Sequence, residues 1–126
     1  MKQSSRDRGS EAETRALDAL RAAGLTLVER NWHCRYGELD LIMRDGDELV
    51  FVEVRSRRRS IGSHFASAAE SIGTRKQQRL LRTAACYLGN LRTPPRCRFD
   101  VVTLETTSDG TMEQKWIQDA FEGPGS

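Results

Sequence analysis

Residues 37–55 read GELDLIMRDGDELVFVEVR, and this stretch decides the fold of the chain. Two apolar runs typical of β-strands, Leu39–Met43 and Leu49–Val54, flank a short Asp-Gly-Asp turn. Each run holds one acid in its interior, Asp40 in the first and Glu53 in the second. An ionised carboxylate among Leu, Ile, Phe and Val side chains costs free energy unless a partner compensates it. The stretch therefore predicts a β-hairpin with two acids that need a partner.

The two acids are expected on one face of this hairpin. Side chains of a strand alternate between the two faces, so Glu53 shares a face with Arg55, and Asp40 shares a face with Ile42. Neighbouring carboxylates repel each other. A divalent cation that prefers hard oxygen ligands, Mg²⁺ or Mn²⁺, removes this repulsion. The alternative is a structural ion pair between these acids and one of the many arginines.

A net charge of +2 conceals a strongly basic segment in the middle of the chain. Between Val54 and Arg82, the only acid is Glu70. The basic residues of this segment are Arg55, Arg57, Arg58, Arg59, Arg75, Lys76, Arg79 and Arg82. Such a concentration of positive charge attracts polyanions, of which nucleic acid is the usual one. The alternative is a solvated polar face.

The length of 126 residues predicts one domain. We expect a disordered N-terminal segment over residues 1–10, a single domain over 11–121 and a flexible tail over 122–126. The N-terminus shows no apolar core of a signal peptide, and no apolar run is long enough to cross a bilayer, so we expect no membrane partner. Three cysteines without a CxxC pair favour a reducing, cytoplasmic location.

Periodicity and turn residues predict the remaining elements. A helix is expected from about Glu11 to Ala23, with Ser10 as its N-cap and Glu13 at the capping-box position. A second helix, Thr74–Leu88, would present an arginine row of Arg75, Arg79 and Arg82. Further strands are predicted at Leu25–Trp32, Arg98–Glu105 and Thr111–Ile117, an exposed basic loop at Ser56–Ser63, and an ambiguous short helix at His64–Ser71. This order predicts an α/β domain with a central mixed sheet.

Several short motifs follow one another in an order typical of a known family. They are an E-x-x-A-x-x-x-L helix beginning at Glu13, Asn31-Trp32, GELDLI at 37–42, FVEVRSR at 51–57 and RFDVV at 98–102. On these motifs the chain resembles the YraN family, small bacterial proteins described as endonuclease-like. That family in turn resembles the restriction-endonuclease-like, or PD-(D/E)xK, superfamily with its Holliday-junction resolvases. The resemblance implies a three-layer domain in which helices flank the central sheet.

The resemblance also implies roles for individual residues. Asp40 resembles the metal-binding aspartate, Glu53 the acid of the (D/E)xK element, and Glu13 a helical acid that completes the metal site. For Glu13, helix capping is the alternative. Arg55 stands where the superfamily has a lysine, and this is a departure. Arginine cannot act as a base, although it can stabilise negative charge in a transition state.

We therefore expect a metal-dependent endonuclease that hydrolyses DNA, branched or otherwise structured, with Mg²⁺ or Mn²⁺ as cofactor. The expected catalytic residues are Asp40, Glu53 and Arg55, and the expected metal ligands are Glu13, Asp40 and Glu53. The expected nucleic-acid-binding residues are Arg57, Arg58, Arg59, Arg75, Lys76, Arg79 and Arg82. The competing expectation is a non-catalytic nucleic-acid-binding module that retains a degenerate nuclease site. RNA as a partner and a homodimer stay open, and few aromatics near the arginines make base stacking less favoured.

Overall fold

The acidic hairpin predicted from the sequence is present at the centre of the sheet. A computed structural model describes residues 5–58 and 72–122. In it, strand β2 (Gly37–Asp45) pairs antiparallel with strand β3 (Glu48–Arg58) across the turn at Gly46. Gly46 has a φ of 61°, a left-handed conformation that glycine adopts without steric cost. Local turn chemistry and strand propensity thus agree in this part of the chain.

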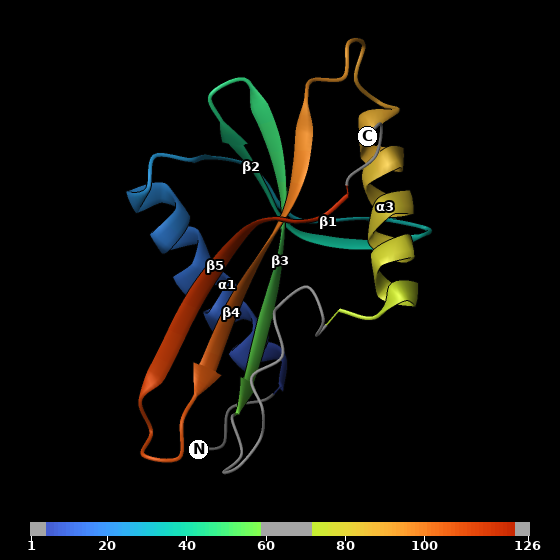
Figure 1. Ribbon diagram of the computed structural model, residues 1–126. Helices are drawn as coiled ribbons and strands as arrows, with labels where there is room; N and C mark the ends of the chain where they lie inside the picture. Colours follow the sequence, from blue (N-terminus) through green and yellow to red (C-terminus); the bar gives the residue numbers. More distant parts are fainter. Residues whose placement is uncertain (1–4, 59–71, 123–126) are drawn as a thin grey trace.

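The sheet is mixed, as predicted. Its strand order is β1-β2-β3-β4-β5, where β1 is Thr26–Cys34, β4 is Cys97–Thr106 and β5 is Met112–Phe121. Strands β3 and β4 are parallel, and the other neighbours are antiparallel. A parallel pair needs a crossover connection, and helix α3 lies in the connection between β3 and β4 (Figure 1).

Two helices cover opposite faces of this sheet, which confirms the α/β, three-layer arrangement. Helix α1 (Ser5–Ala22) packs on one face through Ala16 and Leu20, against a cluster that includes Val50 and Val52. Helix α3 (Thr74–Leu88) packs on the other face through Leu80 and Ala84, against a cluster that includes Phe51. Because Val50, Phe51 and Val52 alternate between the two clusters, β3 is buried on both sides. Figure 1 shows α1 in blue and α3 in yellow on either side of the strands.

Helix α1 begins earlier than the sequence predicted. Its first residue is Ser5, so Ser10 lies inside the helix and the predicted capping box is wrong. The carbonyl of Ser10 accepts hydrogen bonds from the Thr14 hydroxyl (3.0 Å) and from the Arg30 guanidinium (2.9 Å). These bonds satisfy the backbone of a continuing helical turn, and the contact with β1 outweighs the local capping signal. Residues 5–10, part of the segment expected to be disordered, belong to this helix, and residues 1–4 lie outside the described part of the chain.

Two other predicted segments differ from the structure or fall outside it. Residues 56–58, expected in an exposed loop, form the last part of β3, because parallel pairing with β4 continues as far as Arg58 and Thr106. The rest of that loop, the ambiguous helix His64–Ser71 and tail residues 123–126 lie outside the described residues. The predicted helix Thr74–Leu88 is confirmed at both ends.

A buried ion-pair network joins the turn between β2 and β3 to β4 and β5. Asp100 is fully buried, and its carboxylate accepts hydrogen bonds from Arg98, from the Trp116 ring N–H (2.8 Å) and from the Asp119 backbone N–H (3.0 Å). Arg98 also donates to Glu48 at 2.6 Å. The buried charge of Asp100 is thus compensated by a structural ion pair with Arg98.

Replacing Asp100 with alanine is expected to lower the free energy of unfolding by about 3–5 kcal/mol, because the Arg98 guanidinium would stay largely buried without its main acceptor. Urea denaturation followed by circular dichroism measures this change. Asp18→Ala, on the exposed side of α1, is the control and should change stability by less than about 0.5 kcal/mol. A loss below about 1 kcal/mol for Asp100→Ala would show that the network is not a structural requirement.

Candidate functional site

Strands β2 and β3 separate just before the two acids. Their pairing runs from Asp45 and Glu48 to Leu41 and Val52 and then stops. Beyond this point β3 stays paired with β4, whereas the beginning of β2 stays paired with β1. We call this separation the fork. Asp40 and Glu53 are the next residue on each strand, so they stand on the two sides of the fork.

The carboxylate of Asp40 takes the place of the interrupted strand pairing. Its Oδ2 accepts a hydrogen bond from the backbone N–H of Val54 at 2.9 Å. The strict alternation predicted for this run is also interrupted here, because Leu39 packs with Ile42 on the α3 side while Leu41 packs on the α1 side. Side chain and backbone therefore fix the position of Asp40 together.

A cavity of about 690 Å³ opens at the fork, and we call it the fork cavity. It is lined by Glu13 from α1, Asp40 from β2, Glu53 from β3 and Lys76 from α3. Residues far apart in the sequence thus meet at one point, including the three acids that the sequence analysis had grouped. Glu53 is buried, with 6% of its surface exposed, so its charge needs a partner within the cavity.

The fork cavity raises the pKa of one of its acids strongly. Burial and the neighbouring Glu53 carboxylate raise the pKa of Asp40 to about 8, although the N–H of Val54 acts in the opposite direction. At neutral pH and without a cation, Asp40 is therefore largely protonated. Perturbed carboxylates that share a cleft are typical of functional sites.

Lys76, rather than Arg55, supplies the positive charge next to Glu53. The Lys76 Nζ lies 2.7 Å from Glu53 Oε1. From the sequence, Lys76 was predicted to bind nucleic acid, and Arg55 was predicted at the lysine position. Arg55 is half-buried and is not among the described residues that line the fork cavity. The first turns of α3 bring Lys76 there, which no local pattern in the sequence could indicate.

Glu13 points into the fork cavity but is held by neighbours on β1. Its Oε1 lies 3.5 Å from the Arg30 Nε and, with the Asn31 amide nitrogen turned toward the acids, 2.9 Å from that nitrogen. Asn31 donates from the same nitrogen to Glu38 at 3.1 Å and has a φ of 56°, in the left-handed region. Burial raises the pKa of Glu13, whereas the charge of Arg30 lowers it. Arg30 and Asn31 thus contact the site from β1, a role that the sequence did not indicate.

The acids do not form a closed three-acid cage. Within residues 5–58 and 72–122, no group of three or more His, Cys, Asp or Glu side chains lies close enough together to hold a metal ion. Glu13 is engaged by Arg30 and Asn31, so the carboxylates that remain adjacent are those of Asp40 and Glu53. Two adjacent carboxylates still fit Mg²⁺, which is commonly bound by one or two carboxylates together with substrate phosphates and water.

The predicted basic residues divide into separate groups. Arg58 is exposed and lines the fork cavity. Arg57 also lines it but pairs with the buried Glu105 at 3.0 Å, so its charge is partly neutralised. Arg59 lies outside the described residues. Arg75, Arg79 and Arg82 are exposed on α3 and border a different cavity.

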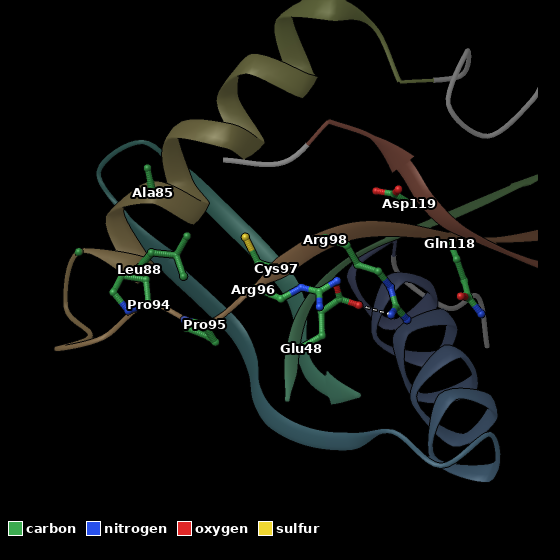
Figure 2. Close-up of a pocket in the computed structure, with 11 residues that line it drawn as sticks. Glu48, Ala85, Leu88, Pro94, Pro95, Arg96, Cys97, Arg98, Gln118 and Asp119 are labelled. Carbon is green, nitrogen blue, oxygen red and sulfur yellow. Dashed lines mark hydrogen bonds and ion pairs between the residues drawn. The ribbon is translucent and has the colours of Figure 1, made fainter. Parts of the chain in front are cut away.

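A second large cavity lies at the other end of β3 and β4 and offers weaker chemistry. It measures about 700 Å³, and Figure 2 shows Glu48 and Arg98 pointing toward each other at its wall. Its strongest charges are already paired, since Arg98 binds Glu48 and Asp100. Burial raises the pKa of the Cys97 thiol in this cavity, which makes it a poor nucleophile at neutral pH. The fork cavity is therefore the better candidate site.

Comparisons with known proteins match most of the chain to proteins of one family. The family model described as "Uncharacterised protein family UPF0102" matches residues 12–104. A UPF0102 protein of Pseudomonas aeruginosa strain LESB58 is 50% identical over 125 residues, which cover 96% of this chain and 97% of the relative. A UPF0102 protein of Nitrosospira multiformis is 47% identical, with 91% and 92% covered. In the described part of the chain, no helix combines the length and apolar character needed to cross a membrane.

The raised pKa of Asp40 predicts how stability depends on pH. Because its pKa lies above the ordinary value of 3.8, Asp40 contributes stability that is complete below about pH 4 and is lost as the pH rises through about 8. Asp40→Asn keeps an acceptor for the Val54 N–H without a charge. In EDTA at pH 9, its melting temperature should exceed that of the wild type by about 4 °C or more, with a smaller difference at pH 5. The same difference in melting temperature between the two proteins at pH 5 and pH 9 would show that the pKa of Asp40 is not raised.

Proposed function

The chain belongs to the UPF0102 family, and we propose that this protein is a divalent-metal-dependent endonuclease that hydrolyses phosphodiester bonds in DNA. The observation that carries the proposal is the fork: two adjacent acids, one with a strongly raised pKa, face a lysine ammonium in an open cavity. Arginines that suit phosphate line this cavity, and further arginines line a second cavity that shares helix α3 with it. The resemblance to endonuclease-like proteins supports the same function and adds branched DNA as the preferred substrate.

Asp40 and Glu53 are the residues that would hold the cation. Their carboxylates repel each other in a buried place, and a cation of hard character relieves that repulsion. When bound, Mg²⁺ or Mn²⁺ would supply Lewis-acid stabilisation of the phosphoryl group and lower the pKa of an attacking water. Glu13 faces the same cavity and would assist through its charge or through water.

The protein's own groups position the substrate and stabilise charge. The Val54 N–H orients Asp40, which keeps one acid fixed while the phosphate is bound. The Lys76 ammonium orients Glu53 and places a positive charge where negative charge develops on the phosphoryl oxygens. Arg58 stands at the same cavity and would bind a neighbouring phosphate. Arg55, predicted as a catalytic residue that stabilises the developing negative charge, is not among the described residues that line the fork cavity, so in this proposal it would act from a greater distance.

One observation favours a second candidate function, a nucleic-acid-binding module without catalysis. The Lys76–Glu53 ion pair at 2.7 Å already compensates the buried acid without any metal ion. A site of this kind would persist as a structural feature after activity was lost. In either function the partner is nucleic acid, and we place the protein in the cytoplasm, in agreement with its three free cysteines. RNA is the competing substrate.

Binding of the cation is expected to stabilise the folded protein. Millimolar MnCl₂ or MgCl₂ should raise the melting temperature of the wild type, because a ligand that binds the native state alone shifts the unfolding equilibrium. The shift should disappear in Asp40→Asn and Glu53→Gln and persist in Asp18→Asn, whose acid lies on the exposed side of α1. An equal shift in all four proteins would indicate nonspecific binding, and no shift in the wild type would count against the metal site.

Cleavage is the direct test of the nuclease. Labelled four-way junction, flap, single-stranded and duplex DNA, with matching RNA, are incubated with purified protein and Mn²⁺. We expect Asp40→Asn and Glu53→Gln to lower the cleavage rate by on the order of 100-fold or more. Lys76→Ala should lower it more than Arg55→Ala, because Lys76 contacts Glu53.

The controls separate the competing interpretations. Equal cleavage by the wild type and Asp40→Asn would reveal a contaminating nuclease. Salt-sensitive binding without cleavage would support the binding module. A larger effect of Arg55→Ala than of Lys76→Ala would show that Arg55, and not Lys76, supplies the positive charge of the motif lysine.

A further inference from the structure

The tip of the β1–β2 hairpin lies against α3. The tip is the two-residue turn Arg35-Tyr36, between Cys34 and Gly37. Gly37 touches the helix so closely that a Cβ there would come within 2.9 Å of the Thr83 hydroxyl oxygen and 3.3 Å of the Arg79 side chain. The contact is possible because β2 leaves β3 at the fork, and Figure 1 shows the hairpin running past α3.

This contact creates a basic cavity of about 310 Å³ that is distinct from the fork cavity. We call it the arginine–tyrosine pocket, and it is lined by Arg35, Tyr36, Arg75, Gln78, Arg79 and Arg82. Four guanidinium groups thus converge on it, and none of its described lining residues is acidic. Guanidinium groups bind phosphate oxygens through paired hydrogen bonds, so this charge is complementary to a nucleic-acid backbone.

An aromatic ring completes the pocket. Tyr36 is 39% exposed, although large apolar and aromatic side chains are usually covered. The Arg35 guanidinium carbon lies 4.8 Å from the centre of the Tyr36 ring and holds it beside the arginines. Exposed aromatic rings next to a basic groove are the platforms on which bases of single strands stack. Few aromatics lie near the arginines along the chain, which predicted little stacking, but the fold brings Tyr36 beside the arginines of α3.

Helix α3 connects the two cavities. Lys76 points into the fork cavity, whereas its neighbour Arg75 and the next turn, Arg79, border the arginine–tyrosine pocket. A strand whose phosphate lies beside Lys76 would therefore meet Arg75 and Arg79 as it continues along the helix. A base inside a duplex is covered by its neighbours on both faces, so only an unpaired base has a face free to stack on Tyr36.

We propose that the arginine–tyrosine pocket binds an unpaired nucleotide of a DNA strand, with the base on Tyr36 and its phosphates on Arg35, Arg75 and Arg79. The proposal rests on the proposed function, because it extends the path of the strand that the fork cavity would cut. It specifies the substrate class: DNA with a single-stranded segment next to the cleavage site, such as a flap or an open junction, rather than continuous duplex.

Fluorescence anisotropy in EDTA, where cleavage is stopped, tests the proposal with labelled single-stranded, flap and duplex DNA. Tyr36→Ala should weaken binding to single-stranded and flap DNA about 10-fold, the usual effect of losing one stacked base, and change duplex binding less than about 2-fold. Tyr36→Phe keeps the ring and should bind like the wild type. Arg79→Ala should weaken all three and reduce the salt dependence by about one phosphate contact. Arg92→Ala, an exposed arginine outside the pocket, is the matched control.

A second measurement does not depend on the folding of a variant. Single nucleotides of the flap are replaced, one position at a time, with abasic sites. At the position whose base stacks on Tyr36, this change should lower the affinity of the wild type to that of Tyr36→Ala. The same change should leave the affinity of Tyr36→Ala unchanged. Unchanged single-strand binding by Tyr36→Ala, or an equal loss for duplex, would overturn the pocket. A wild type that binds but does not cut would overturn the nuclease and leave the pocket standing. A wild type that binds no DNA would overturn both.

Discussion

The separation of β2 from β3 after Leu41 and Val52 is the constraint on which the rest of the structure depends. A sheet that stayed paired would press Asp40 against Glu53 with no room for water, substrate or cation. Because the strands part, the carboxylate of Asp40 satisfies the backbone of Val54, and a cavity opens between the layers. The same separation sends the hairpin tip toward α3, so one break in hydrogen bonding shapes two cavities.

The two buried acidic centres, around Asp100 and at the fork, differ in how their charges are compensated. Around Asp100, every acceptor has a donor, and Arg98 supplies a charge of opposite sign within the core. At the fork, Lys76 pairs with Glu53, and Asp40 keeps a proton because burial and the neighbouring Glu53 carboxylate raise its pKa. A fully satisfied network holds a structure together, whereas a partly satisfied one leaves free energy that a ligand can recover. This contrast distinguishes the structural cluster around Asp100 from the candidate functional cluster at the fork.

Much of the fold follows from local pattern, whereas the site depends on tertiary placement. The hairpin, β4 and both ends of α3 were predictable because strand runs, turn residues and helical periodicity lie next to one another in the chain. The grouping of Asp40 with Glu53 followed from the same hairpin. The approach of Lys76 to Glu53 was not predictable, since it depends on where α3 crosses the sheet. Ser10 misled the prediction because a capping signal also occurs inside a helix that a neighbouring strand supports.

Both outer strands of the sheet are irregular at their exposed edges. Strand β1 has a register shift between Leu27 and Glu29, and pairing of β5 with β4 shifts between Phe99 and Val101, near Asp119 with its φ of 52°. Such shifts bend a strand and disturb the row of free N–H and C=O groups along its edge. Addition of a strand from a second chain is therefore disfavoured at the places where these shifts interrupt the edges. The irregular pairing thus limits edge-to-edge association of a sheet that is also interrupted at its centre, at the fork.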